Sequence, residues 1–313
     1  MINKLAISLS AVMALSTAYA QDINLGIIST ESTTNLKADW QPLIDDMSTK
    51  TGYNIKAFFA SDYAGVIEAM RFNKVQVAWF GNKSAMEAVD RAKGEIFAQM
   101  VNADGTEGYY SHMIVHKDSP VNNLDDLLKM SKNLTFSNGD PNSTSGFLVP
   151  SYYVFSKNKV DPKTMFKAVR AANHEANALA VANKQIDVAT NNSENLGRIK
   201  DRMPEIASNI KVIWTSPLIP SDPMVIRSDL DPAVKAKIKD FFYSYGSDDK
   251  EKATLMQLSK ITGFKVSSNN QLKPIRQLEL FKARNKLEAD TTISAADKTA
   301  KLADIDKQLA MLN

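Results

Sequence analysis

Apolar and polar residues follow two different periods in the first third of the chain. Three short apolar runs predict strands, at residues 22–28, 55–59 and 75–80. Between the first two runs, apolar side chains recur at the i, i+3, i+4, i+7 spacing of one buried helix face: Trp40, Leu43, Ile44 and Met47. Gly52 is expected to end that helix, and a second helix is expected over residues 64–72. This alternation predicts parallel strands joined by crossover helices.

A second series of the same kind follows a polar, proline-containing segment near residue 118. Its strands are expected at residues 134–137, 166–170, 186–190 and 211–214, and its longer helices at residues 147–157 and 177–183. Pro217, Pro220 and Pro223 then crowd one segment, which must be extended because each proline disfavours helix. We interpret residues 115–120 and 215–223 as two connections between lobes.

The expected fold class is therefore α/β, with two Rossmann-like lobes and a hinge that is crossed twice. Lobe one is expected to comprise residues 21–115 and 220–273, and lobe two residues 116–219. Residues 274–313 form a C-terminal helical tail, in which Ile275, Leu278 and Phe281 share one helical face. A second tail helix starts near Ser294 and carries the apolar stripe Leu302, Ile305, Leu309 and Leu312. This stripe packs either on its own lobe or against a second copy of the chain in a homodimer.

The first twenty residues have the pattern of a cleaved secretory signal peptide. Lys4 precedes an apolar run of roughly 10 residues, and Ala18-Tyr19-Ala20 matches the small-x-small cleavage pattern. The run is shorter than the ~20 residues that span a bilayer, so we prefer a signal peptide to a membrane anchor. An exported, periplasmic protein is expected, and the chain contains 0 cysteines.

The charged residues argue against nucleic-acid and metal binding. The formal net charge is +3, and lysine and arginine are scattered among acidic residues instead of forming the basic stripe of a nucleic-acid surface. His112 and His116 share one face of a predicted strand, but no cysteine or close acidic residue completes a zinc site. The sequence therefore predicts no nucleic-acid partner, no metal and no cofactor.

Three consecutive hydroxyl residues, Ser143, Thr144 and Ser145, lie between a predicted strand and a predicted helix. At a helix N-terminus they offer donors beside free backbone N–H groups and the positive end of the helix dipole, which suits an anion. Ordinary N-capping is the alternative, and it explains one hydroxyl better than three. A hydrolase using Ser145, His174 and Asp222 is a weaker alternative, because no nucleophile-elbow motif surrounds the serine.

Six short motifs together resemble the phosphonate-binding proteins of bacterial ABC transporters. They are residues 31–33 (EST), 79–82 (WFGN), 143–146 (STSG), 174–175 (HE), 191–194 (NNSE) and 219–223 (IPSDP). The resemblance covers most of residues 22–273, and the STSG turn is its most specific part. It implies a type II-like periplasmic binding protein that binds its ligand between the lobes, catalyses no reaction and delivers the ligand to an ABC transporter permease.

The resemblance also implies roles for eight residues. Ser143, Thr144 and Ser145 would hold the phosphonate oxygens, with His174 as a further donor. Tyr63 and Tyr109 would close the other side of the cleft, and Tyr110 stands beside the second of these. Glu194 and Asp222 would receive the ammonium group of an aminoalkyl phosphonate such as 2-aminoethylphosphonate. Another small oxyanion, such as phosphite, is the alternative ligand.

Overall fold

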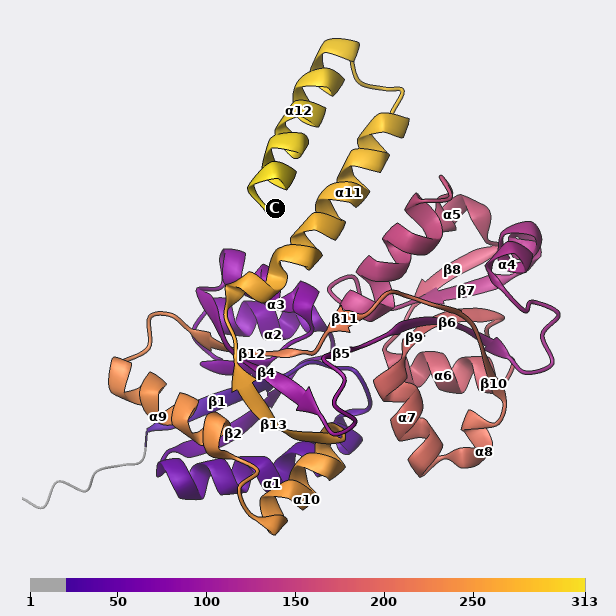
Figure 1. The fold of residues 1–313 in the computed structure, drawn as a ribbon. Coiled ribbons are helices and arrows are strands. Elements are labelled where there is room, and N and C mark those ends of the chain that lie inside the picture. Colours follow the sequence, from indigo (N-terminus) through magenta and orange to yellow (C-terminus); the bar gives the residue numbers. More distant parts are fainter. Residues whose placement is uncertain (1–20, 313) are drawn as a thin grey trace, which may run out of the picture.

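A mixed six-stranded sheet forms the centre of the first lobe (Figure 1). The computed structural model describes residues 21–312, so the expected signal peptide lies outside the described residues. The strand order is β13-β4-β12-β3-β1-β2. These strands are β1 (Asp22–Ile27), β2 (Asn54–Phe59), β3 (Val77–Trp79), β4 (Gly94–Asn102), β12 (Pro223–Arg227) and β13 (Ile261–Val266). As predicted, β1 runs parallel to both β2 and β3, whereas β12 runs antiparallel to its neighbours β3 and β4.

Helices cover this sheet and bury the face that the sequence predicted. They are α1 (Thr33–Thr51), α2 (Tyr63–Arg71), α3 (Asn82–Arg91), α9 (Pro232–Ser244), α10 (Asp249–Ser259) and the short η4 (Asn269–Leu272). Trp40, Leu43, Ile44 and Met47 of α1 are all at most 2% exposed. Gly52 ends α1 in the left-handed conformation (φ 67°), as expected of a glycine C-cap.

The second lobe contains a five-stranded sheet with the order β10-β6-β9-β7-β8. Its strands are β6 (Ser111–His116), β7 (Thr135–Asn138), β8 (Ala168–Ala171), β9 (Val188–Asn192) and β10 (Ile210–Thr215). The helices are α4 (Leu124–Met130), η1 (Ser131–Asn133), η2 (Thr144–Leu148), η3 (Ser151–Ser156), α5 (Pro162–Met165), α6 (His174–Ala182), α7 (Ser193–Arg202) and α8 (Pro204–Ala207). Separate apolar clusters around Phe136 and Val181 fill this lobe.

The chain passes between the two sheets at two short paired strands, β5 (Gly108–Tyr109) and β11 (Ile219–Pro220). The second crossing lies within the expected segment 215–223. The first lies before the expected segment 115–120, because residues 111–116 form β6 and pair with β9 and β10. At Gly108 a Cβ atom would lie 1.9 Å from the Ile219 carbonyl oxygen, so only glycine permits this close approach of the crossing strands.

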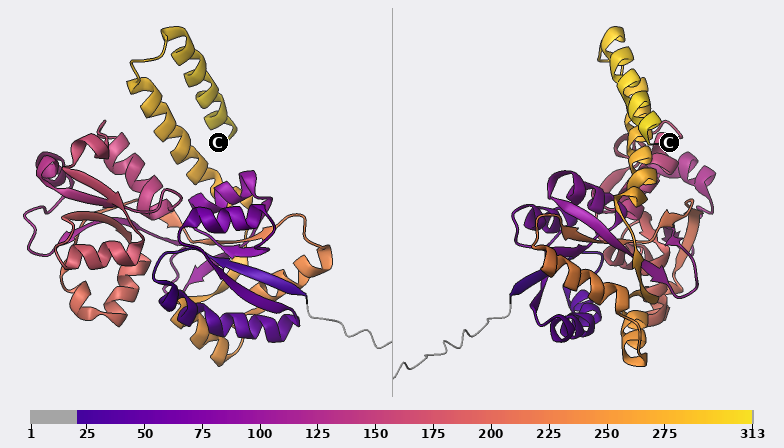
Figure 2. Two further views of the ribbon diagram at one scale, coloured as in Figure 1. Left: turned by 180° about the vertical axis from the view of Figure 1, so that it is seen from behind. Right: turned by 60° about the vertical axis from the view of Figure 1, so that its left-hand side comes forward.

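The C-terminal tail is a helical hairpin that projects from the two lobes (Figure 2). It consists of α11 (Lys273–Ala289) and α12 (Ala295–Met311), and α12 starts directly after Ser294, as the sequence predicted. Ser294 caps α12 by accepting a hydrogen bond from the Asp297 N–H at 3.1 Å. The start of α11 is anchored by the buried Ile275. Further along α11, Phe281 stacks on Tyr152 and Asn285 bonds to Ser156 of the second lobe.

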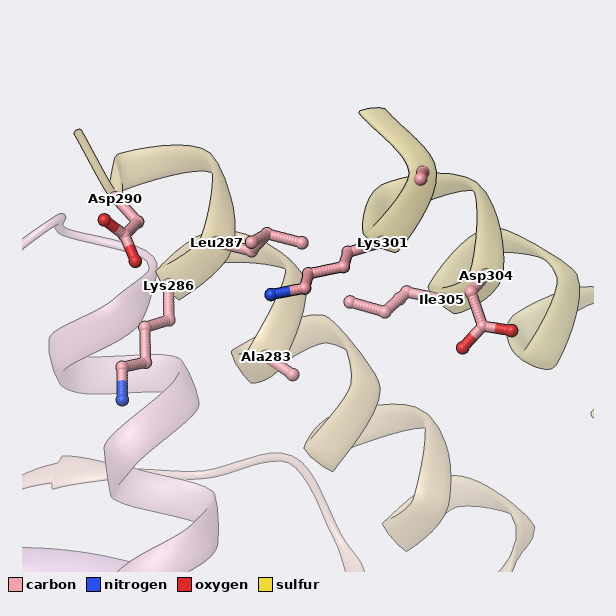
Figure 3. A pocket seen from close by; sticks show the side chains of 8 residues that line it. Ala283, Lys286, Leu287, Asp290, Lys301, Asp304 and Ile305 are labelled. Carbon is pink, nitrogen blue, oxygen red and sulfur yellow. The ribbon is translucent and has the colours of Figure 1, made fainter. Parts of the chain in front are cut away.

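The apolar stripe of α12 packs against α11, and its side chains stay partly exposed. A groove of about 570 Å³ lies between the two helices (Figure 3). Leu287 and Ile305 point into it from opposite sides, together with charged side chains at its rim. No helix within residues 21–312 combines the length and hydropathy needed to cross a membrane.

Candidate ligand-binding site

The three hydroxyl residues lie at the start of a continuous helix over residues 144–156, which follows β7. The helix begins three residues before the position that the sequence predicted. It is wound in the wider π form, in which the Leu148 N–H donates to the Ser143 carbonyl oxygen at 3.1 Å. Thr144 and Ser145 therefore belong to its first turn.

Each of the three hydroxyls has a different partner, and all three residues are at most 2% exposed. Ser143 caps the helix, because its Oγ accepts a hydrogen bond from the Gly146 N–H at 2.9 Å. The Thr144 Oγ1 accepts from the Lys83 N–H at 2.8 Å, and the Ser145 Oγ accepts from the Asn192 side-chain amide at 3.1 Å. N-capping thus accounts for one hydroxyl and leaves two turned to other elements.

Two glycines bring the hydroxyl turn close to its surroundings. The Gly139 N–H donates to the Gly146 carbonyl oxygen at 2.9 Å, and a Cβ on Gly139 would lie 2.6 Å from the Gly146 Cα. A Cβ on Gly146 would lie 3.0 Å from the His174 ring. The absence of side chains at both positions lets the turn pack directly against the imidazole.

His174 is the first residue of α6, which Asn173 caps. Its Nε2 lies 3.4 Å from the Ser143 Oγ, and its Nδ1 has no hydrogen-bond partner within the described part of the chain. Burial, with a smaller contribution from the charge of Arg198, lowers the pKa of His174 to about 3. The ring is therefore neutral at pH 7 and can donate one hydrogen bond.

Tyr63 and Tyr109 approach the hydroxyl turn and the carboxylates from the first lobe and the hinge. Tyr63 begins α2 and is 2% exposed, and its backbone N–H donates to the Asp140 Oδ2 at 3.1 Å. Tyr109 lies on β5 and is 4% exposed, whereas the neighbouring Tyr110 is 36% exposed. Burial and then the charge of Asp222 raise the pKa of Tyr109 well above its usual value, so this hydroxyl stays protonated.

The two carboxylates lie on different elements of the fold but interact with each other. Glu194 is the second residue of α7, and Asp222 lies between β11 and β12. Burial and the nearby Glu194 raise the pKa of Asp222, although the Tyr109 hydroxyl and the Trp79 indole favour its charged form. Burial also raises the pKa of Glu194, which Arg198 opposes. The Asp222 Oδ1 is buried without a hydrogen-bond partner in the described structure.

Gly81, after β3, lies close both to the hydroxyl turn and to the Asp222 carboxylate. A Cβ built on Gly81 would lie 3.2 Å from the Thr144 Oγ1 and 3.8 Å from the Asp222 Oδ1. The Tyr63 hydroxyl likewise interacts with both Ser143 and Asp222. Hydrogen-bond donors and two desolvated carboxylates therefore meet in one region between the lobes, at the carboxyl ends of parallel strands.

The lobes are closed around this region. Hydrogen bonds that cross between them include Lys83 N–H to Thr144, Tyr63 N–H to Asp140, and Ser32 N–H to the Glu175 Oε2 at 2.6 Å. Glu175 also accepts from the Asn35 side chain at 2.6 Å.

The geometry does not assemble the serine hydrolase considered from the sequence. Ser145 bonds to Asn192, whereas His174 approaches Ser143, and Asp222 interacts with Tyr109 and Glu194. Within residues 21–312, no group of histidine, cysteine and acidic side chains is arranged to hold a metal ion.

Sequence reasoning missed two polar side chains at this site. Arg198 is i+4 from Glu194 on α7, and this helical spacing was the available signal. Trp79 belongs to the quoted WFGN motif, but nothing in the sequence indicated that its indole would face Asp222.

Residues 25–272 match the sequence profile of a family described as "ABC transporter, phosphonate, periplasmic substrate-binding protein". The chain belongs to this family. This binding protein is 56% identical over 299 residues to the phosphonates-binding periplasmic protein of Escherichia coli (strain K12), which covers 94% of this chain and 88% of the relative. It is also 30% identical over 234 residues to a phosphate-import protein of Mycolicibacterium smegmatis, covering 72% of each chain.

A solved structure of similar sequence confirms the fold of the binding protein. The binding-protein component of an ABC phosphonate transporter from Pseudomonas aeruginosa is 55% identical, with a TM-score of 0.92 and coverage of 94% of this chain and 97% of that one. A Prochlorococcus marinus protein solved with methylphosphonate has a TM-score of 0.74 at 21% identity, covering 82% and 97%, and shares the fold. These relatives are periplasmic substrate-binding proteins, not enzymes, which removes the hydrolase alternative.

Proposed function

We propose that this protein captures an aminoalkyl phosphonate, of the size of 2-aminoethylphosphonate, in the periplasm and delivers it to the permease of an ABC transporter. The observation that carries the proposal is the opposition of donors and carboxylates in one closed cleft. Ser143, Thr144, Ser145 and His174 would bind the phosphonate oxygens. Tyr63 and Tyr109 would close the cleft around the ligand.

The carboxylate end argues for an amine on the ligand. Ionisation of both Glu194 and Asp222 is unfavourable in the empty cleft, because burial disfavours the charged form of each and their charges repel. An ammonium group on the ligand would neutralise the two carboxylates, whereas phosphite or a simple alkyl phosphonate offers no cation. The same pair would therefore discriminate against those ligands by leaving a buried charge unpaired.

Calorimetric titration of purified residues 21–313 tests this assignment with four ligands: 2-aminoethylphosphonate, ethylphosphonate, phosphite and phosphate. We expect 2-aminoethylphosphonate to bind tightest, and ethylphosphonate to bind more weakly because it retains the anion and loses the amine. Tighter binding of phosphite or phosphate than of either phosphonate would contradict the proposal. The absence of product after prolonged incubation is the expected companion result for a protein that only binds.

We further propose that the C-terminal hairpin forms a homodimer. The hairpin projects from the lobes and leaves Leu302, Ile305 and Leu309 partly exposed beside an open groove, and burial of these side chains by a second copy would remove apolar surface from water. Sedimentation should give a dimer that becomes monomeric when Leu302 and Ile305 are both replaced by aspartate, with ligand binding retained. A wild-type protein that is monomeric at high concentration would end this proposal.

A further inference from the structure

Helix α7 carries three charged side chains along one face. Glu194, Arg198 and Arg202 are separated by four residues each, so they lie one above another along the helix. The first faces Asp222 at the proposed ligand site, and the other two point to the first lobe. α7 thus joins the ligand end of the cleft to a second set of contacts between the lobes.

Both arginines bind acidic residues of the first lobe. The Arg198 Nε donates to the Glu31 Oε1, and the Arg202 Nη1 lies 3.2 Å from the Glu31 Oε2. The Arg202 Nη2 reaches both Asp39 oxygens, at 2.7 and 2.8 Å. Glu31 follows β1 and Asp39 lies on α1. Every one of these pairs therefore crosses from one lobe to the other.

This cluster differs from ordinary surface ion pairs in its burial. The side chains of Glu31, Asp39 and Arg198 are 4%, 8% and 11% exposed, and that of Arg202 is 32% exposed. Charges withdrawn from water interact more strongly than exposed ones, provided that each keeps its partner. Asn195 of α7 adds a weak bond to Glu31 at 3.5 Å. Opening the lobes must break all of these contacts together.

We propose that Glu31, Asp39, Arg198 and Arg202 form a latch that stabilises the closed state and slows ligand release. Arg198 and Arg202 share a helix face with Glu194. A ligand that binds Glu194 and fixes the start of α7 therefore also keeps the two arginines opposite Glu31 and Asp39. Arg198 and Arg202 act as positioning residues and need not touch the ligand. This coupling rests on the proposed amine site, whereas the latch itself does not.

The chain offers a matched control on the same helix. Asp201 pairs with Lys260 of the first lobe at 2.6 Å, so this pair also crosses between the lobes, but both side chains are more than half exposed. Exposed pairs contribute little to stability. Asp201→Asn should leave closure almost unchanged, whereas Arg202→Gln should weaken it. Asp39→Asn removes the other side of the same buried pair and should also weaken closure, although Arg202 keeps its contact with Glu31.

The test follows opening and closing by single-molecule fluorescence transfer between two dyes. Because the chain has 0 cysteines, dyes can be attached through Lys74→Cys and Lys129→Cys, at exposed positions in different lobes. Arg202→Gln should shorten the closed-state lifetime and raise the dissociation rate of 2-aminoethylphosphonate about tenfold at 0.1 M salt. The double variant should resemble Arg202→Gln alone, because Arg202→Gln already breaks the pair with Asp39. Asp39→Asn should have the smaller effect, since Arg202 keeps its contact with Glu31.

Equal closed-state lifetimes in wild type, Arg202→Gln and Asp201→Asn, with each variant folded by circular dichroism, would overturn the latch. Additive effects of Arg202→Gln and Asp39→Asn would overturn the pairing on which it rests. Failure of the wild-type protein to bind 2-aminoethylphosphonate would instead overturn the proposed function, because the fluorescence of the unliganded protein still reports on the latch.

Discussion

Replacement of Glu194 by glutamine should separate recognition of the amine from recognition of the phosphonate. The substitution removes one charge and almost no volume. Glu194 keeps part of its surface exposed at the start of α7, although its carboxylate is desolvated in the cleft, and Asp222 remains to pair with an ammonium group. We therefore expect the loss to correspond to one hydrogen bond with a charged partner, ~1.5–3 kcal/mol, and not to the larger cost of stranding a buried ion.

This energy corresponds to a roughly 10- to 150-fold weaker affinity for 2-aminoethylphosphonate. Ethylphosphonate has no cation, so its affinity should stay constant or increase, because the variant removes repulsion between a carboxylate and the phosphonate and relieves the unfavourable charge beside Asp222. The decisive quantity is the ratio of the two affinities, since a general disturbance of the fold would lower both.

Calorimetry of both ligands with both proteins, at fixed pH and salt, measures this ratio. The control is Glu175→Gln, which removes a carboxylate from the lobe interface but not from the ligand site. It should lower both affinities by a similar factor. Equal losses of the two ligands in Glu194→Gln would refute amine recognition by Glu194.

Three further substitutions test the hydroxyl turn, the buried Asp222 and the stability of the first lobe. Thr144→Val removes a hydroxyl that accepts a hydrogen bond from the Lys83 N–H. Binding of either phosphonate should weaken about tenfold or more by calorimetry, and unchanged affinity would show that this hydroxyl does not bind the ligand. Burial raises the pKa of Asp222, so the folded state loses stability as pH rises to neutral and this carboxyl would ionise. Asp222→Asn should therefore raise the melting temperature by about 2–4 °C and weaken binding of 2-aminoethylphosphonate. A lower melting temperature would contradict this reasoning. Burial alone would raise the pKa of Glu251, but Lys50 and the N–H groups of Gly246 and Ser247 lower it to about 2. The ionised Glu251 therefore stabilises the fold, and this stabilisation is lost as pH falls from 4.5 to 2. Glu251→Gln should lower the free energy of unfolding in urea by roughly 2 kcal/mol at pH 7 and by less at low pH.

Local periodicity was sufficient to predict the parallel part of each lobe. The face of α1 that includes Trp40 and Met47 is buried as expected, and the strands before the site begin and end within about two residues of their expected positions. The antiparallel strands β4 and β13 were not predicted. Pairing between β12 and β4 joins residues far apart in the chain, and single-segment periodicity carries no information about such partners.

The candidate site was only partly accessible from sequence. The consecutive hydroxyls indicated a helix N-terminus, but the π winding that starts the helix at Thr144 depends on packing against β9 and Lys83. The neutral state of His174 follows from burial, which a sequence does not reveal. The first crossing was expected too late, because the polar segment near residue 118 resembles a hinge although it follows a strand of the second sheet.

The crystal structure of the protein in complex with 2-aminoethylphosphonate is the most direct test of the central claim. We predict phosphonate oxygens within about 2.7–3.2 Å of hydroxyls in the Ser143 to Ser145 turn and of the His174 ring, and the amine between Glu194 and Asp222. A ligand bound in the opposite orientation, or outside the cleft, would contradict it.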